Sequence, residues 1–317
     1  MDKFMVSPSP HIRSTRDTSV IMLDVIIALI PAGAFSIYLF GIRSLLVIAA
    51  CILSAVLFED IYCMLNKRPS TTGNLSAAVT GLLLAYNLPP GIPLWIAIIG
   101  SGVAIIIVKE LFGGIGHNFV NPALAARIFL LASWPAAMTS WILPRADAVT
   151  GPTPLALIKG KEIAGASLPT YHDLFIGNIG GCIGETSKVL LLLGALYLLF
   201  RKVISWHIPI SFIATVALLT WIFGGSTPFS GDYIYHILSG GLILGAFFMA
   251  TDYTTSPMTR AGHLVMGIGC GFITAVIRLF GGYPEGVSYA ILLMNLLVPL
   301  IDRYSIPRSF GGGKIRA

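Results

Sequence analysis

Two hydroxyl side chains stand on a short, stiff segment near the middle of the chain, Thr150-Gly151-Pro152-Thr153-Pro154. The prolines fix φ and remove backbone donors, and Gly151 permits a positive φ, so Thr150 and Thr153 are expected on a non-helical turn. A hydroxyl held on a rigid, exposed turn is able to accept a covalent group. Turn chemistry alone also explains this composition, and from local physics it is the default interpretation.

A second stretch, residues 109–127, combines glycines with amides: Lys-Glu-Leu-Phe-Gly-Gly-Ile-Gly-His-Asn-Phe-Val-Asn-Pro-Ala-Leu-Ala-Ala-Arg. Its glycines let the backbone turn or approach a flat ligand. Asn121 precedes Pro122 and is expected to cap a helix that starts there. Asn118 and Asn121 both donate and accept hydrogen bonds, so they are candidates to meet the polar edge of a planar cofactor. Helix capping alone is the alternative, which local physics favours.

Charged residues within apolar segments form a third class of candidates, because a charge inside a membrane is costly and is usually functional or paired. Arg127 lies within such a segment and is expected to have a functional role or an acidic partner. The acids at or within the ends of the apolar segments are Asp24, Glu59, Asp60, Glu110 and Asp252. Any of these could serve a cation path, although Glu59 and Asp60 are interpreted as interfacial.

The cysteines predict no metal site. Cys51, Cys63, Cys182 and Cys270 form no Cys-x-x-Cys pair and lie in or near different apolar segments. We interpret them as small core residues.

Composition places the chain among integral membrane proteins. Hydrophobic residues make up 56% and charged residues 11%, with a mean hydropathy of +0.85, whereas soluble domains carry about 25% charged residues. The net charge of +6 comes from basic residues in short loops and at the ends, which is typical of orienting charge in a membrane protein. A nucleic-acid partner is therefore excluded.

The apolar segments predict an all-α integral membrane protein with about ten transmembrane helices, judged against a span of roughly 20 residues. They are Val20–Phe40, Ser44–Leu65, Leu75–Leu88, Pro93–Phe112, Pro122–Leu143, Ser187–Val203, Ile208–Gly224, Tyr233–Ala250, Leu264–Phe280 and Gly286–Ile301. The third is short and ends at Pro89-Pro90, which indicates a broken helix near a central site, where protein or water covers the freed backbone groups.

A polar interval after the fifth segment divides the chain into five helices plus five. We predict a tail at 1–19, a first half at 20–143, a loop at 144–186, a second half at 187–303 and a tail at 304–317. Residues 1–19 lack the features of a signal peptide. The distribution of lysines and arginines, with Lys109 counted among the cytoplasmic charges, places both tails in the cytoplasm and the loop with Thr153 on the outer face.

The two halves resemble each other weakly. Gly-Leu-Leu-Leu-Ala at 81–85 and Lys-Glu-Leu-Phe-Gly-Gly at 109–114 are echoed by Gly-Leu-Ile-Leu-Gly at 241–245 and Ile-Arg-Leu-Phe-Gly-Gly at 277–282. Because five is an odd number of crossings, two such halves would have opposite orientations, the inverted repeat that places a site between halves in transporters. Chance similarity between apolar strings is the alternative.

Three motifs in sequence order resemble one membrane protein family. Asp147, Thr150, Gly151 and Thr153 match the flavinylation motif Asp-x-x-(Ser/Thr)-Gly-Ala-(Ser/Thr), with Pro152 where the family usually has Ala. The stretch at 109–127 and Phe-Met-Ala-Thr-Asp at 248–252 complete the match. Together they resemble the D subunit of Rnf complexes, and also the B subunit of the sodium-pumping NADH:quinone reductase. The first span begins near Val20, without the longer N-terminal extension of the quinone reductase protein, so the Rnf protein is the better match.

The resemblance implies a flavoprotein in a bacterial or archaeal cytoplasmic membrane. It implies FMN joined by a phosphoester bond to Thr153 through a flavin transferase, and riboflavin bound toward the inner face near Asn118 and Asn121. Electrons would pass from reduced ferredoxin to NAD, coupled to export of Na+ or H+. The partners would be the A, B, C, E and G subunits of the Rnf complex.

A solute channel or transporter is the alternative function, since inverted halves and a broken third helix suit it equally. The flavin motif separates the two interpretations. The coupling ion, the redox potentials and the location of the ion path within the complex are left open.

Overall fold

The computed structural model describes residues 17–144, 151–159 and 168–306, and within these residues the chain forms helices and no strand. Five helices in this part of the chain are long and apolar enough to cross a membrane. They are α1 (Thr18–Phe40), α2 (Ile42–Leu65), α4 with its continuation (Leu94–Phe112), α13 (Arg260–Phe280) and α14 (Val287–Ser305). Shorter apolar helices are α3 (Ser76–Tyr86), α5 (Pro122–Ser133), α9 (Lys188–Phe200) and α10 (His207–Phe223). The predicted all-α multi-pass membrane class is confirmed.

Several predicted spans are interrupted. The third is short, as expected, since α3 stops at Tyr86 before the prolines. The eighth is not one helix: α11 (Tyr233–Leu238) and α12 (Leu242–Leu244) are separated at Gly240, whose φ of +69° ends the helical path, and a π-helical stretch follows at Gly245–Met249. The fifth is also shorter than predicted, because α5 ends at Ser133 and only the single turn α6 (Pro135–Met138) follows it.

The interval predicted as a loop, Pro144–Thr186, contains helices. Its described parts form α7 (Pro154–Ile158) and α8 (Tyr171–Ile176). Both begin at a threonine cap, because the side chains of Thr153 and Thr170 accept hydrogen bonds from the amides of Ala156 and Asp173. Local capping therefore gives this polar segment more order than its composition suggested.

The surface of α1 illustrates how the helices meet lipid. Leu23, Ile27 and Ile30 are exposed at 46%, 43% and 56%, whereas Asp24 and Ala28 on the opposite face are buried. A helix in contact with lipid typically turns its apolar face outward and its polar residues toward the protein interior.

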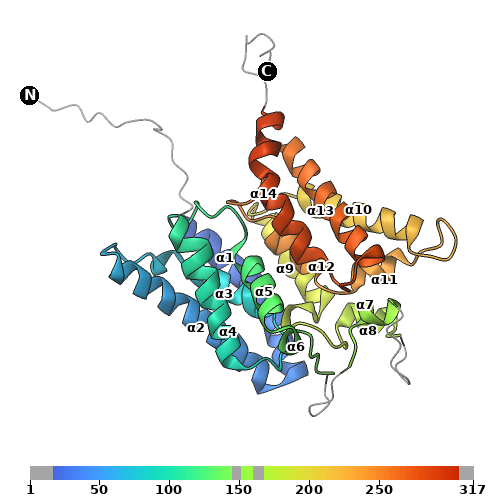
Figure 1. Cartoon of the computed structure of the whole chain (residues 1–317), viewed down its shortest axis with the longest axis horizontal. Helices are drawn as coiled ribbons and strands as arrows, with labels where there is room; N and C mark the ends of the chain where they lie inside the picture. Colours follow the sequence, from blue (N-terminus) through green and yellow to red (C-terminus); the bar gives the residue numbers. More distant parts are fainter. Residues whose placement is uncertain (1–16, 145–150, 160–167, 307–317) are drawn as a thin grey trace, which may run out of the picture.

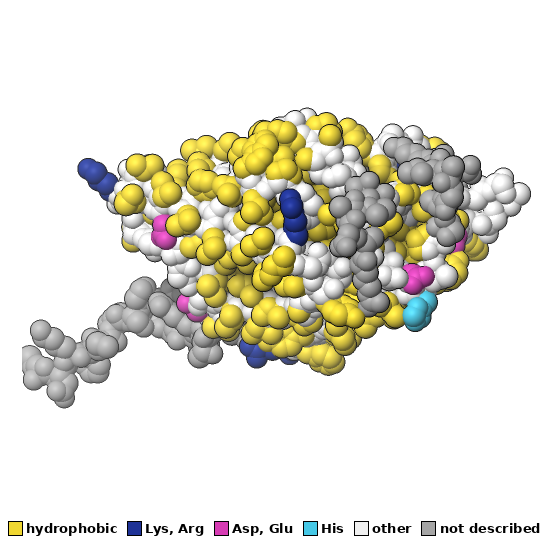
Figure 2. All heavy atoms as spheres, turned by 90° about the horizontal axis from the view of Figure 1, so that it is seen from below, with side chains coloured by type: hydrophobic (Ala, Val, Ile, Leu, Met, Phe, Trp, Pro, Cys, Tyr) yellow, Lys and Arg dark blue, Asp and Glu magenta, His cyan; other side chains and the backbone are white. Residues whose placement is uncertain are grey.

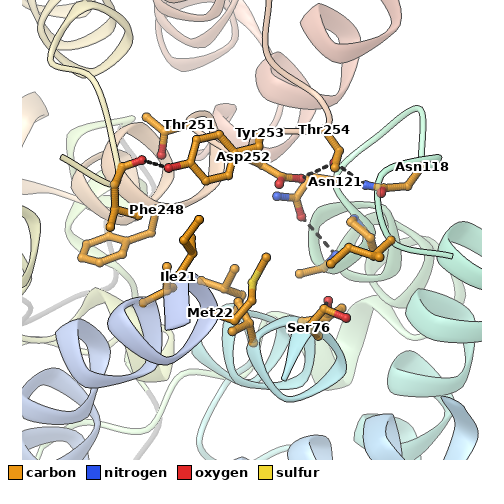
Figure 3. A pocket seen from close by; sticks show the side chains of 18 of the residues that line it. Ile21, Met22, Ser76, Asn118, Asn121, Phe248, Thr251, Asp252, Tyr253 and Thr254 are labelled. Atoms are coloured by element: carbon orange, nitrogen blue, oxygen red, sulfur yellow. Dashed lines mark hydrogen bonds between the residues drawn. The ribbon is translucent and has the colours of Figure 1, made fainter. Parts of the chain in front are cut away.

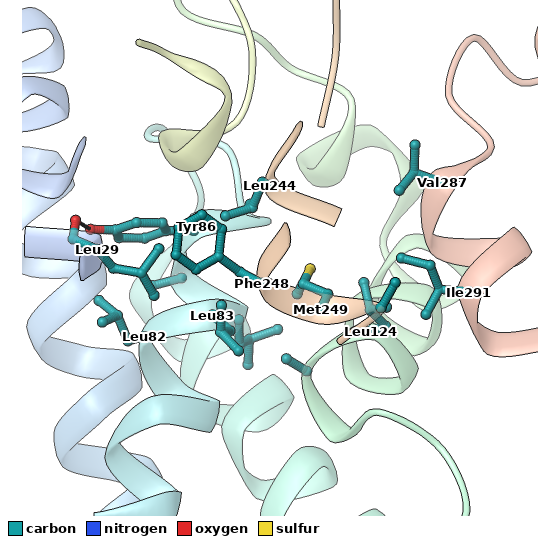
Figure 4. Packing of buried hydrophobic residues seen from close by; sticks show 14 of the residues in the cluster. Leu29, Leu82, Leu83, Tyr86, Leu124, Leu244, Phe248, Met249, Val287 and Ile291 are labelled. Carbon is teal, nitrogen blue, oxygen red and sulfur yellow. Dashed lines mark hydrogen bonds between the residues drawn. The ribbon is translucent and has the colours of Figure 1, made fainter. Parts of the chain in front are cut away.

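The helices pack in two groups. α2 packs on α3 and α4, and α10 packs on α11 and α13. The two groups meet where α1 packs on α9 and α5 on α14. Figure 4 shows the core between them, where Tyr86 of α3, Leu124 of α5 and Ile291 of α14 surround Phe248 and Met249 of the π-helical stretch. The interrupted elements therefore lie at the centre of the molecule.

Different helices lie at the two opposite ends of the molecule. α1 begins and α14 ends on the same side, while α7 and α8 lie at the opposite edge (Figure 1). The face seen from below that edge is mostly hydrophobic with few charged side chains (Figure 2). We refer below to the termini end and the α7 end.

Candidate functional site

A cavity opens among α1, α3, the glycine-rich turn at residues 113–118 and the π-helical stretch at Gly245–Met249. It has about 810 Å³ of empty space, including its open mouth. Most of its lining is apolar, with Ile21 and Met22 from the start of α1 and Phe248 among the contributors. Polar side chains gather on one side, where Figure 3 shows Asn118 and Asn121 opposite Ile21 and Met22. We call this space the Asn118 cavity. A mostly apolar lining with a few convergent polar groups is typical of a site for a small organic ligand.

The two predicted asparagines come together at this cavity. Asn121 caps α5, since its Oδ1 accepts from the amides of Ala123 and Leu124 at 3.1 and 3.2 Å, so the capping prediction is confirmed. Its Nδ2 donates to the carbonyl of Met249 at 3.3 Å. Asn118 Nδ2 donates to Thr254 Oγ1 at 2.9 Å. The amides therefore connect the region of the glycine-rich turn with Met249 and Thr254, in addition to lining the cavity.

Glycine is required in the turn before Asn118. Gly113, Gly114 and Gly116 have φ values of +120°, +88° and +87°, which L-residues with a side chain rarely adopt. The predicted backbone turn is confirmed at these positions.

Glu59, which the sequence indicates as an interfacial acid, has a buried cationic partner in the structure. It is fully buried, and Lys109 Nζ lies 2.7 Å from its Oε2. Lys109 also donates to Ser76 Oγ at 2.7 Å and lies 3.8 Å from Glu110. Lys109 is therefore a buried partner of Glu59 rather than a loop charge, because the packing of α2 against the end of α4 brings the two together. Asp60 is partly exposed, and its carboxylate accepts a hydrogen bond from the hydroxyl of Ser70.

The remaining acids occupy different surroundings. Asp24 accepts hydrogen bonds from Tyr197 and Arg201 at 2.8 and 3.2 Å, across the contact of α1 with α9. Asp252 lines the Asn118 cavity and accepts from Thr254 at 3.1 Å.

Thr153 lies at the α7 end, where it is the N-cap residue of α7, and it is 9% exposed. The expectation of an exposed hydroxyl is wrong for the folded chain. Gly151 does not have a positive φ. A side chain is disfavoured there for lack of space, because a Cβ would come within 2.9 Å of Leu143. Asp147 and Thr150 lie outside the described residues.

A largely buried ion pair lies at the α7 end, and the sequence pointed only to its cation, Arg127. Arg127 has the acidic partner that was expected for it: Nη2 lies 2.6 Å from Glu285 Oε2 and 3.9 Å from Glu185 Oε1. Its Nη1 donates to Asn87 and Ser288 at 3.0 and 2.8 Å. Neither glutamate stands out in the sequence, because both lie in connections between helices rather than inside apolar runs.

Two further buried cations, Lys188 and Arg278, lie near this pair. Lys188 Nζ donates to the backbone carbonyls of Glu185 and Gly240. Arg278 donates to the backbone carbonyl of Ser239 at 3.2 Å and to that of His236. They satisfy the backbone carbonyls freed by the break between α11 and α12. The signal that could have found them is a charge within an apolar span.

The four cysteines are buried and unpaired by disulfides. Cys182 donates to the carbonyl of Asn87 at 3.3 Å. Within the described ranges, no group of three or more His, Cys, Asp or Glu side chains could hold a metal ion.

Comparison with known proteins gives matches along nearly the whole chain. The model of the NQR2, RnfD, RnfE family matches residues 5–311. The D subunit of the Na(+)-translocating ferredoxin:NAD(+) oxidoreductase complex of Acetobacterium woodii is 52% identical over 98% of this chain and 96% of its own length.

Two other relatives carry names that specify a different translocated ion or none in particular. The D subunit of the proton-translocating ferredoxin:NAD(+) oxidoreductase complex of Clostridium ljungdahlii is 47% identical over 97% of this chain and 96% of its own length. The D subunit of the ion-translocating oxidoreductase complex of Stutzerimonas stutzeri is 41% identical over 95% and 93%. The resemblance inferred from the motifs is confirmed, and the chain belongs to the NQR2, RnfD, RnfE family, among the D subunits of Rnf complexes.

Proposed function

We propose that the chain is the flavin-carrying membrane subunit of an ion-translocating ferredoxin:NAD+ oxidoreductase, with covalent FMN on Thr153 and non-covalent riboflavin in the Asn118 cavity. It works in a complex with the A, B, C, E and G subunits and is loaded by a flavin transferase. The observation that carries the proposal is the presence of two candidate sites at opposite ends of one chain whose relatives are ion-translocating oxidoreductase subunits.

The residues of the Asn118 cavity fit a flavin. Apolar side chains such as Met22 and Phe248 suit a flat aromatic ring, and the amides of Asn118 and Asn121 suit its polar edge. A bound flavin supplies the electron transfer, while the protein holds the ring, orients it and sets the charge around it. Asn121 is itself held by α5 and by Met249, so its amide is pre-positioned rather than free to rotate.

The surroundings of Thr153 would hold an attached FMN on a well-anchored segment. The short helix α7 starts directly after Thr153. Hydrogen bonds fix both ends of the segment, from Gly151 to the carbonyl of Trp141 and from Lys159 to the carbonyl of Tyr283. Because Thr153 is only 9% exposed, we expect the transferase to act before this segment folds against the rest of the protein, or to displace it.

The proposed topology has both tails in the cytoplasm and α7 on the outer face, with ten spans in two inverted halves. The termini end and the α7 end are opposite (Figure 1), and the halves use equivalent packing, α2 on α4 and α10 on α13. This arrangement would put the two flavins toward opposite membrane faces.

The coupling ion does not follow from similarity. The relatives at 52% and 47% identity are named for translocating Na+ and protons respectively. Na+ or H+ export is therefore proposed without a choice between them.

Mass spectrometry of covalent flavin tests the proposal. The full chain is co-expressed with a flavin transferase, and the peptide of residues 146–159 is analysed. We expect an FMN adduct in the wild type and in Thr153→Ser, which keeps a hydroxyl, and none in Thr153→Ala.

Thr170→Ala is the matched control, since Thr170 caps α8 as Thr153 caps α7, so it removes an equivalent cap without removing the acceptor. Thr150→Ala should also keep the adduct. An adduct that survives in Thr153→Ala would contradict the assignment.

A solute channel or transporter without redox cofactor is the second candidate, favoured by the interrupted helices α3 and α11–α12 at the centre. Fluorescence of the denatured chain in a gel separates the two, because a plain transporter would carry no covalent flavin.

A further inference from the structure

A second cavity lies beside the segment that carries Thr153. It has about 510 Å³ of empty space, its open mouth included. Its walls are formed by α5, by α6 and the residues after it, and by the start of α14 with the connection that precedes it. Trp141, Tyr283 and Tyr289 are its aromatic side chains, and Arg127 and Glu285 are its charged ones. We call it the Arg127 cavity.

Two hydrogen bonds hold the Thr153 segment against this cavity. The amide of Gly151 donates to the carbonyl of Trp141 at 3.0 Å, and Lys159 Nζ donates to the carbonyl of Tyr283 at 2.6 Å. Both acceptors belong to residues of the cavity wall. Thr153 follows Gly151 by two residues, so their Cα atoms are at most about 7 Å apart. A group esterified to Thr153 therefore starts close to the Arg127 cavity.

The lining suits a flat, electron-accepting ring. Tyr283 and Tyr289 lie with centroids 5.7 Å apart and planes 31° from each other, and Trp141 adds a third aromatic surface, the kind of group on which planar heterocycles stack. Arg127 supplies a cation whose position is set by its bonds to Glu285 and Ser288. A nearby cation stabilises a ring that gains negative charge on reduction.

We propose that the Arg127 cavity receives the ring system of the flavin tethered at Thr153, between Trp141 and Tyr289 and within reach of Arg127. The inference rests on the proposed covalent FMN and adds where its ring binds. It assigns positioning roles to Trp141 and Tyr289, which nothing in the motif itself singles out.

Emission of the tethered flavin tests this binding site, because contact with tryptophan or tyrosine quenches flavin fluorescence. The full chain is loaded by a flavin transferase in wild type, Trp141→Leu, Tyr289→Leu and Trp221→Leu. Trp221 is the control, since it is a 41% exposed tryptophan of α10 outside the cavity. The same measurement on Thr153→Ala gives the contribution of non-covalent flavin, which is subtracted. Leucine at 141 keeps the carbonyl that binds Gly151, and two wall variants guard against one failing to fold.

We expect both wall variants to emit more strongly than wild type while folded and equally after denaturation, and Trp221→Leu to match wild type in both states. Unchanged emission of the folded wall variants, with covalent flavin at wild-type level, would overturn the inference and leave the proposed function standing. Absence of covalent flavin from the wild type would overturn both. Equal rises in Trp141→Leu, Tyr289→Leu and Trp221→Leu would also overturn it, since the change would then be unspecific.

Discussion

The Asn118 cavity and the Arg127 cavity lie toward opposite ends of the molecule and are bordered by opposite balances of buried charge. Beside the first, Lys109 is the cation and Glu59, Glu110 and Asp252 are the acids, so the formal charges of this group sum to −2. At the second, Arg127, Lys188 and Arg278 face Glu185 and Glu285, so three cations against two carboxylates sum to +1. These sums cover the residues just named, counted as ionised.

The difference shows how one fold can give two cavities unlike electrostatic surroundings. A cation favours the reduced, more negative form of a cofactor, and an acid disfavours it. On the proposed function, a flavin at the Arg127 cavity would accept electrons more readily than one at the Asn118 cavity.

Breaking the Lys109–Glu59 pair should have the largest effect on stability. Lys109→Met leaves Glu59 fully buried without its cation, at a cost of about 3–5 kcal/mol. Thermal unfolding of the purified protein in detergent measures this. The double variant Lys109→Met/Glu59→Gln should recover part of the loss, because no uncompensated charge then remains. Arg201→Met, at the partly exposed pair with Asp24, serves as the control with a smaller effect, and an equal loss there would contradict the burial argument.

Breaking the Arg127–Glu285 pair should cost somewhat less and should also report on the cofactor. Glu285 is 15% exposed in its side chain and keeps the amide of Gly241 as a donor, so we expect a loss of about 3 kcal/mol in Arg127→Met, the lower end for such pairs. In the flavin-loaded protein, Arg127→Met should lower the midpoint potential of the covalent flavin, measured by spectroelectrochemistry.

Arg127→Lys keeps the charge and is the matched variant for the potential. A potential that falls equally in Arg127→Lys and Arg127→Met would mean that the charge of this cavity does not tune the flavin.

Removing the amides of the Asn118 cavity should weaken ligand binding by about 1–3 kcal/mol, or roughly ten- to a hundredfold. The measurement is extractable riboflavin per covalent flavin in wild type, Asn118→Ala and Asn121→Ser. Serine keeps a helix cap at 121 but loses the amide donor, so it separates the two roles of Asn121. A wild-type ratio in both variants would leave these asparagines with their structural roles alone, and covalent FMN should be unchanged throughout.

Labelling should distinguish the two ends with little effect on the fold. His172 at the α7 end and Tyr304 at the end of α14 are both exposed, and all four native cysteines are buried. In intact cells an impermeant thiol reagent should modify His172→Cys and spare Tyr304→Cys until lysis. The reverse pattern would invert the proposed topology. Lys159 is unsuited to this test because it bonds to the carbonyls at the end of α13.

The sequence alone determined the features that depend on neighbouring residues. Apolar runs indicated the membrane class, the prolines after Leu88 indicated the short third helix, and Asn121 before Pro122 indicated the start of α5. These are local effects, since burial of a backbone in lipid, loss of an amide and capping each act within one or two turns.

Tertiary structure alone decided which charges are paired and which groups are covered. Arg127 and Glu285 are 158 positions apart, and Lys109 and Glu59 are 50 apart, so only the packing of α5 against α14 and of α2 against α4 brings them together. The burial of Thr153 depends likewise on the docking of its segment on Trp141 and Tyr283. Whether a charge or a hydroxyl is buried depends on residues from other helices, and no local pattern contains that information.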